Sequence, residues 1–201
     1  MEPLVIATRN LGKLEEIRQI LGSDVLLHSL ADYLNAPEVV EDGDTFEANA
    51  VKKAVTIAAH TEHITLADDS GLEVDALNGA PGIYSARFSG EDATDSRNNE
   101  KLLNELKAVS QESRTARFRC VIALATPGGS IQTANGVLEG TILNAPRGDH
   151  GFGYDPLFLV PNLGFTLAEL PPEKKNPISH RGRALQAALP FILSTIQSKS
   201  S

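Results

Sequence analysis

Two adjacent carboxylates, Asp68 and Asp69, follow a short apolar run and precede a serine and a glycine in the segment 67–75. Neighbouring acids repel each other and lose hydration when buried. A fold therefore keeps them at a strand end only where a cation, water or hydrogen-bond donors compensate. Ligands also tend to bind at strand ends in α/β proteins. Because Asp, Ser and Gly favour turns, an acidic turn is the alternative. The segment predicts a ligand or cation site, or else a solvated turn.

The turn at 8–13 has the residue types that bind phosphate. A helix that starts here offers free backbone N–H groups and the positive end of its dipole. Thr8 and Asn10 add side-chain donors, and Lys13 adds a charge one turn into the helix. The glycine pattern of a Walker A loop is missing. The alternative is an ordinary capped helix with a solvated lysine.

Glu41, Asp69 and, further along, Asp68 and Asp75 are candidate ligands for a hard cation. Mg²⁺ takes oxygen ligands and keeps several waters, so one or two carboxylates are enough when substrate phosphates supply the rest. The sequence lacks the Cys and His spacing of a zinc site. For Glu41 the alternative is a solvated acid in a turn.

Glycines surround Phe152 and Tyr154 in the segment 150–156. Such a segment lets the backbone approach a flat ligand, against which the aromatic rings can stack. It is not a dinucleotide-binding fingerprint, because Pro156 stands at the sixth position and no helix is predicted to start there. A tight turn with two core aromatic residues is the alternative.

Cations and a histidine gather at 173–183, where the last helix is predicted to start. Positive charges oppose the dipole at a helix N-terminus, and a bound polyanion would relieve that conflict. The alternative is a basic patch on the surface.

The bulk composition limits the classes of partner. The chain has 201 residues, 41% of them apolar, and a net charge of −8. It can bury a sizeable core, and the charge argues against a partner gripped through nucleic-acid phosphates. We expect no signal peptide and no membrane span. The single cysteine, Cys120, allows no internal disulfide and lies in an apolar run that is typical of the core.

The elements that must position these residues follow from periodicity and turn signals. Strands and helices alternate in the first third of the chain and the middle is antiparallel, which predicts an α/β fold with a mixed sheet. Asn10 is the expected N-cap of the first helix, and Asp44 with Glu47 forms a capping box for the second. Pro190 should kink or restart the last helix. The predicted strands are 4–7, 25–30, 64–67, 118–125, 131–138 and 157–160, and the predicted helices are 11–21, 45–60, 96–109 and the segment after Ser179.

Several segments, in this order, resemble the inosine triphosphate pyrophosphatase family. The resemblance covers about Leu4 to Leu189 and departs from the family at His150, where a glycine is common. It implies an α/β fold with a long curved mixed β-sheet flanked by helices, in two lobes with a central active-site cleft. We expect one domain of this family over 1–197, and the polar residues at 198–201 predict a frayed tail. The segments are Thr8-x-Asn10-x-x-Lys13, Glu41-Asp42-Gly43-Asp44-Thr45-Phe46, Asp68-Asp69-Ser70-Gly71-Leu72, Pro81-Gly82-x-Tyr84-Ser85-Ala86-Arg87, Phe152-Gly153-Tyr154-Asp155-Pro156 and Ser179-His180-Arg181.

The resemblance implies hydrolysis of dITP, ITP and XTP to the monophosphate and pyrophosphate with Mg²⁺, by a homodimer. The lone cysteine is compatible with the cytosol, so we expect a cytoplasmic location. Asp69 would be the catalytic proton acceptor and a metal ligand, with Glu41 as the second metal ligand. The substrate-binding residues would be Thr8, Asn10, Lys13, Ser70, Phe152, Gly153, Tyr154, Asp155, Lys175, His180 and Arg181.

Two other functions remain open. A Maf-like pyrophosphatase would act on modified pyrimidine nucleotides, so a nucleotide panel distinguishes it. A non-catalytic nucleotide-binding protein is the second, and the intact acidic pair together with Lys13 argues against it. A missing glycine fingerprint after the first strand disfavours an NAD-dependent dehydrogenase.

Overall fold

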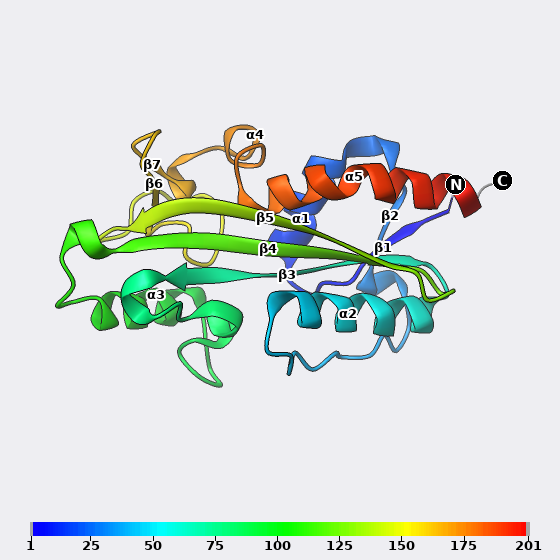
Figure 1. The fold of residues 1–201 in the computed structure, drawn as a ribbon, viewed down its shortest axis with the longest axis horizontal. Coiled ribbons are helices and arrows are strands. Elements are labelled where there is room, and N and C mark those ends of the chain that lie inside the picture. The colour runs from blue at the N-terminus through cyan, green and yellow to red at the C-terminus, as the bar shows by residue number, and fades with distance from the viewer. Residues whose placement is uncertain (1, 200–201) are drawn as a thin grey trace. The chain divides into compact units, whose positions relative to one another are not determined.

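A computed structural model describes residues 2–199 (Figure 1). Its strands form one seven-stranded sheet in the order β2-β1-β3-β4-β5-β6-β7. The strands are β1 (Leu4–Ile6), β2 (Leu27–Ser29), β3 (Ile64–Val74), β4 (Thr115–Ala125), β5 (Ile131–Ile142), β6 (Phe158–Val160) and β7 (Phe165–Thr166). The helices are α1 (Leu11–Leu21), α2 (Phe46–Thr61), α3 (Asp95–Glu105), α4 (Pro172–Lys175) and α5 (His180–Lys199).

The sheet is mixed, as the alternation of elements predicted. β1 pairs in parallel with β2 and with β3, so that Leu4 lies opposite Leu27 on one side and Ile64 on the other. β6 pairs antiparallel with both β5 and β7. The parallel pairing of β1 with β2 and β3 follows from the alternation of strands and helices at the start of the chain. A helix between two strands lets the second strand run in the same direction as the first.

The chain divides into two compact units. Unit 1 comprises the described residues up to Asp69, then Cys120–Gly136, then those from Arg181 onward. Its core joins apolar residues of β1, β3 and β4 to one face of α1 and α5, and α2 lies on the other side of these strands (Figure 1). Cys120 is 1% exposed in this core, as expected.

Unit 2 comprises Ser70–Arg119 and Val137–His180. Its core gathers apolar side chains from the second half of β3, from α3 and from β6, among them Leu72, Leu102 and Phe158. Phe118 and Phe158 lie with their ring centroids 4.6 Å apart in this core.

The acidic pair lies inside a strand, which corrects the prediction that the strand ends at residue 67. β3 runs on to Val74, and Asp68 and Asp69 are 2% and 5% exposed. The alternative of a solvated acidic turn is therefore wrong. The strand continues because Leu72 and Val74 are fully buried, and because partners distant in sequence compensate the two charges.

Several element ends also differ from prediction. Thr45, not Asp44, caps α2, and its side chain accepts a hydrogen bond from the backbone N–H of Ala48. Pro190 lies inside α5, which continues past it to Lys199. Ser198 and Lys199 thus belong to the helix, and the rest of the expected frayed tail, 200–201, lies outside the described residues.

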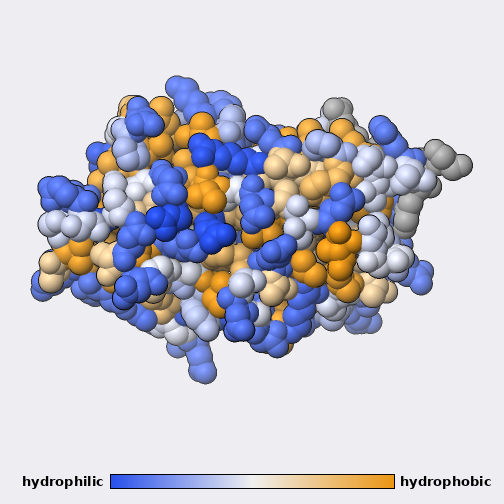
Figure 2. All heavy atoms as spheres, in the orientation of Figure 1, coloured by the Kyte–Doolittle hydropathy of each residue, from blue (hydrophilic) through white to orange (hydrophobic). Residues whose placement is uncertain are grey.

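The surface mixes residue types. Figure 2 shows charged and polar residues interspersed with small apolar patches on the face that it views. Within the described part of the chain, no helix combines the length and the apolar character needed to cross a bilayer.

Candidate functional site

Asp68 is the centre of a buried group of charges in unit 1. Its Oδ2 lies 3.3 Å from Nζ of Lys13, and it accepts hydrogen bonds from Nε and Nη2 of Arg181 at 3.2 and 3.1 Å. Burial alone would raise the pKa of Asp68, but the charges of Lys13, Arg181 and Lys53 together hold it well below its ordinary value. Asp68 is therefore a fixed anion that holds two cations in place.

Arg181 completes this group from the start of α5. Its side chain is 2% exposed, and its Nη1 pairs with the carboxylate of Glu16 on α1. Burial opposes the charge, but Asp68 and Glu16 outweigh it and raise the pKa of the guanidinium. A surface patch is thus the wrong description of Arg181. Its charge is buried and paired with carboxylates from two other elements.

The carboxylate of Asp69 contacts a different cation, Lys53. Its Oδ1 lies 3.3 Å from Nζ of Lys53, which also lies 2.5 Å from Oε1 of Glu41 and donates to the carbonyl of Asp68 at 2.7 Å. Oδ2 of Asp69 is buried and has no hydrogen-bond partner among the described residues. Burial raises the pKa of Asp69 despite the nearby charge of Lys53, and Glu41 adds to the rise. Such a carboxylate is suited to accept a proton.

Lys53 is the residue that the sequence predictions missed. Burial alone would lower its pKa, but Asp69, Asp68 and Glu41 raise it, so Lys53 is a cation between acids. Its side chain is only 11% exposed. A signal was present, because Lys53 shares the apolar face of α2 with Ala50, Ala54 and Ile57, at helical spacing. A lysine on such a face needs a buried anion.

The turn at residues 8–13 caps a helix, as one interpretation predicted, but its lysine is not solvated. Oδ1 of Asn10 caps α1 by accepting from the backbone N–H of Lys13 at 3.0 Å, and Oγ1 of Thr8 accepts from the N–H of Asn10 at 3.2 Å. Thr8 and Asn10 therefore order the helix start. Lys13 is not a solvated lysine, because its side chain is 17% exposed and it pairs with Asp68.

In unit 2 the segment after β5 is held by a second buried ion pair. Nζ of Lys175 lies 2.5 Å from Oδ2 of Asp155, and the same oxygen accepts from the backbone N–H of Phe152 at 3.0 Å. The ammonium of Lys175 also lies 5.2 Å from the ring centroid of Phe152. Lys175 is 4% exposed, so it too is no part of a surface patch.

The two aromatic residues of this segment differ. Tyr154 is 4% exposed, its hydroxyl donates to the carbonyl of Ser85 at 2.8 Å, and burial raises its pKa. Tyr154 is thus a core residue, whereas Phe152 is half-buried. His180 is 5% exposed and stacks on Phe118, with ring centroids 4.6 Å apart. Ser70 is half-buried in β3.

The chain is similar to proteins of a known family along nearly its whole length. A profile of the Ham1 family matches residues 4–191. The chain belongs to the Ham1 family. A relative from Geobacter sulfurreducens named dITP/XTP pyrophosphatase is 61% identical over 92% of this chain and 94% of its own length. A relative of the same name from Desulforamulus reducens is 55% identical over 94% of each chain.

Solved structures of the Ham1 family share the fold. The Ham1 protein of Staphylococcus aureus matches with a TM-score of 0.85 and 41% identity, over 96% of this chain and all of that one. A structure from Mycobacterium abscessus, described as a nucleoside-triphosphatase and dITP/XTP pyrophosphatase, matches with a TM-score of 0.75 and 46% identity, over 94% and 99%. The family indicated by the motifs and the predicted α/β fold, a mixed sheet flanked by helices, are both confirmed.

Glu41 and Asp69 are the carboxylates of this Ham1 chain that fit a hard cation. The buried Oδ2 of Asp69 without a hydrogen-bond partner supports this, and Lys53 already shows that the pair attracts positive charge. No cluster of three or more His, Cys, Asp or Glu with metal-site geometry occurs in residues 2–199. Two carboxylates alone would leave most of the shell of a bound Mg²⁺ to water and phosphate oxygens, which is how this ion is commonly held. Asp75 is exposed, and its carboxylate accepts from Thr115 and pairs with Arg117.

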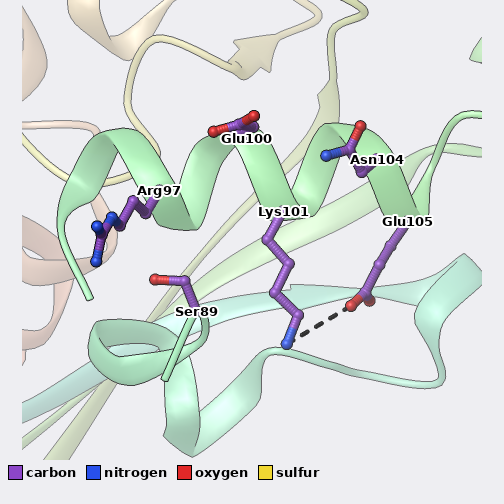
Figure 3. A pocket seen from close by; sticks show the side chains of 6 residues that line it. All are labelled: Ser89, Arg97, Glu100, Lys101, Asn104 and Glu105. Atoms are coloured by element: carbon purple, nitrogen blue, oxygen red, sulfur yellow. Dashed lines mark ion pairs between the residues drawn. The ribbon is translucent and has the colours of Figure 1, made fainter. Parts of the chain in front are cut away.

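A pocket along α3 lies outside these groups (Figure 3). Its lining mixes both signs of charge, and Lys101 lies 3.7 Å from Glu105 and donates to the carbonyl of Phe88 at 2.8 Å. Its ammonium is thus already partnered. None of the residues predicted from the motifs lines this pocket, which is formed by Ser89, Arg97, Glu100, Lys101, Asn104 and Glu105.

Replacement of Gly151 by alanine is expected to lower the free energy of unfolding by about 2–4 kcal/mol. Gly151 has a φ of 75°, and a Cβ there would overlap Oδ2 of Asp155. The overlap would break the Asp155–Lys175 pair. Urea unfolding measures the effect, and Gly129→Ala is the control, because Gly129 also has a positive φ but an added Cβ meets no atom. Equal losses in the two variants would show that strain alone acts.

Proposed function

We propose that this Ham1 family protein hydrolyses dITP, ITP and XTP to the nucleoside monophosphate and pyrophosphate, which removes these nucleotides from the pool. The observation that carries the proposal is the contact of buried Lys53 with both buried Asp69 and half-buried Glu41 in unit 1. Relatives at 61% and 55% identity are named for this activity.

The residues of unit 1 supply the phosphate chemistry in this proposal. Asp69 and Glu41 would hold Mg²⁺, which would supply positive charge against the phosphate oxygens. Asp69 takes a proton from the water that attacks the α-phosphorus. The new bond joins the water oxygen to phosphorus, and the bond to the bridging oxygen breaks as pyrophosphate leaves. Lys13 binds the phosphates, with Thr8 and Asn10 shaping the turn that carries it.

Asp68 and Lys53 keep this group of charges in position. Asp68 holds Lys13 and Arg181, so the lysine is presented at a fixed place instead of ranging through solvent. Lys53 offsets the repulsion between Glu41 and Asp69, because its ammonium contacts both. Both effects prepare the charges before substrate arrives, and such preorganisation strengthens transition-state stabilisation.

The residues of unit 2 supply the nucleoside contacts in the proposal. The segment Phe152, Gly153, Tyr154 and Asp155 offers a half-buried aromatic face and backbone groups. Ser70 also contacts the substrate, and Lys175 joins Lys13 in stabilising the triphosphate and its leaving group. His180, with Arg181 at the start of α5, completes substrate binding. Inosine and xanthine carry a carbonyl at position 6, whereas adenine carries an amine. Donors that meet this position stay unsatisfied against adenine, which costs binding free energy.

A nucleotide panel tests the proposal. We expect kcat/KM for dITP and XTP to exceed that for ATP by at least about 100-fold, because the site would leave buried donors unpaired against adenine. Release of pyrophosphate, measured with and without Mg²⁺, is the readout. Equal values for ATP and dITP would overturn the purine specificity. Preference for dTTP or UTP would favour a Maf-like activity, and no release from any nucleotide would favour a binding protein.

The finer expectations of a homodimer and a cytoplasmic location are part of the same proposal. The homodimer rests on the resemblance of the motifs, and the cytoplasmic location rests on the lone cysteine. Sedimentation of the purified chain tests the dimer, and a single species with the mass of one chain at micromolar concentration would contradict it.

A further inference from the structure

We propose that Asp95 and Asn99 of α3 are positioning residues for the nucleobase, because together they hold both polar backbone groups of Gly153. Gly153 lies between Phe152 and Tyr154 in the segment proposed to contact the nucleoside. The inference rests on that proposed function and adds to it two residues that the motif analysis did not select.

The contacts are specific and come from one helix face. The backbone N–H of Gly153 donates to Oδ2 of Asp95 at 2.7 Å. Nδ2 of Asn99 donates to the carbonyl of Gly153 at 2.9 Å. Asp95 and Asn99 are four residues apart, so their side chains lie on the same face of α3. One loop residue thus receives an acceptor and a donor from a single rigid element.

These two bonds fix two successive peptide planes. The N–H of Gly153 belongs to the peptide group that it shares with Phe152, and its carbonyl belongs to the group that it shares with Tyr154. Gly153 has a φ of 62°, a conformation in which glycine is favoured but not held. Because glycine is the most freely rotating link in the segment, the orientation of Phe152 relative to Tyr154 depends on what holds this residue.

The neighbours of Gly153 are anchored by other means. The hydroxyl of Tyr154 donates to the carbonyl of Ser85, and the carboxylate of Asp155 holds both Lys175 and the N–H of Phe152. Gly153 is the remaining link in this chain of contacts. The bond to Asp95 is charge-assisted, which makes it stronger than a bond between neutral groups. The pair Asp95–Asn99 therefore sets the half-buried ring of Phe152 in the pose that a flat base meets.

The test separates base binding from phosphate binding. We expect Asp95→Ala and Asn99→Ala each to raise KM for dITP and the dissociation constant for IMP by about 5- to 10-fold, the effect of losing one such hydrogen bond. The value of kcat should stay within about twofold. The dissociation constant for pyrophosphate, which lacks a base, should not change. Asp95→Asn keeps an acceptor oxygen and should restore most of the affinity for IMP.

Matched controls come from the same helix. Glu100→Ala and Asn104→Ala remove an acid and an amide from exposed positions of α3, and both should bind IMP as the wild type does. Exchange of the Gly153 amide hydrogen, followed by NMR, should quicken in Asp95→Ala and not in Glu100→Ala. Variants that match their controls in IMP affinity would overturn the inference. So would a parallel loss of pyrophosphate affinity, because that would indicate a general structural defect.

The outcomes also distinguish the two proposals. A wild type that binds IMP through Asp95 but releases no pyrophosphate from dITP would refute the proposed function and leave the positioning role standing. If the wild type hydrolyses dITP but Asp95→Ala and Asn99→Ala leave KM unchanged, the positioning role would be refuted and the proposed function would stand. A wild type that neither binds IMP nor hydrolyses dITP would refute both.

Discussion

Replacement of Asp69 by asparagine is expected to lower kcat for dITP by about 10³-fold, because the amide cannot accept the proton of the attacking water. The shape of the residue is nearly unchanged, and Oδ1 can still contact Lys53. Binding should therefore survive, with a dissociation constant for dITP within about tenfold of the wild type. Pyrophosphate release in saturating Mg²⁺ measures the first effect, and calorimetric titration measures the second.

The control for this variant is Asp75→Asn. Asp75 is an acid of the same type in the same region of sequence, but its carboxylate is exposed and bonded to Thr115 and Arg117. Its turnover should stay within about twofold of the wild type. Near wild-type turnover in Asp69→Asn would remove Asp69 from the proposed mechanism. If kcat fell by a similar factor in both variants, the loss would come from removing a negative charge and not from the position of Asp69.

Replacement of Asp68 by alanine is expected to lower the free energy of unfolding by about 3–5 kcal/mol, because it leaves buried cations without their common anion. Arg181 keeps Glu16, but Lys13 loses the one carboxylate that the structure shows within 4 Å of its ammonium among the described residues. Unfolding in urea without added metal measures the change. We expect activity to fall as well, since Lys13 is then no longer held.

Asp42→Ala is the matched control for the loss of an ion pair. Oδ1 of Asp42 lies 2.5 Å from Nζ of Lys52, but both side chains are well exposed, so the loss of stability should be much smaller than in Asp68→Ala. If Asp68→Ala cost no more than Asp42→Ala, the buried charges would not stabilise the fold as argued.

The stabilisation by Asp68 should also depend on pH in one direction. Its pKa is lower in the folded state than the value of 3.8 that applies without the fold. The folded state therefore binds its proton less readily, and the contribution is full above about pH 5. It should shrink as the pH falls below 3.8. A gap between wild type and Asp68→Ala that widened on acidification would contradict this assignment.

The sequence by itself determined the family and most of the longer elements. The apolar spacing of α1 and its cap at Asn10 depend on neighbours along the chain, so they could be predicted and were confirmed. The order of the motifs determined the family in the same way. The end of β3 could not be predicted, because contacts with residues distant in sequence decide whether polar residues such as Asp68 stay in a strand.

The resemblance assigned the chemistry to Asp69 and not to Asp68, but only the tertiary structure shows the partners of these two neighbouring acids. Adjacent residues in a strand point to opposite faces, so Asp68 meets Lys13 and Arg181 while Asp69 meets Lys53. These cations come from α1, α5 and α2, which no spacing rule connects. The sequence shows only that two adjacent carboxylates need cations or hydrogen-bond donors to compensate their charge. Folding decided which carboxylate holds the cations and which keeps a buried oxygen without a hydrogen-bond partner in the described chain.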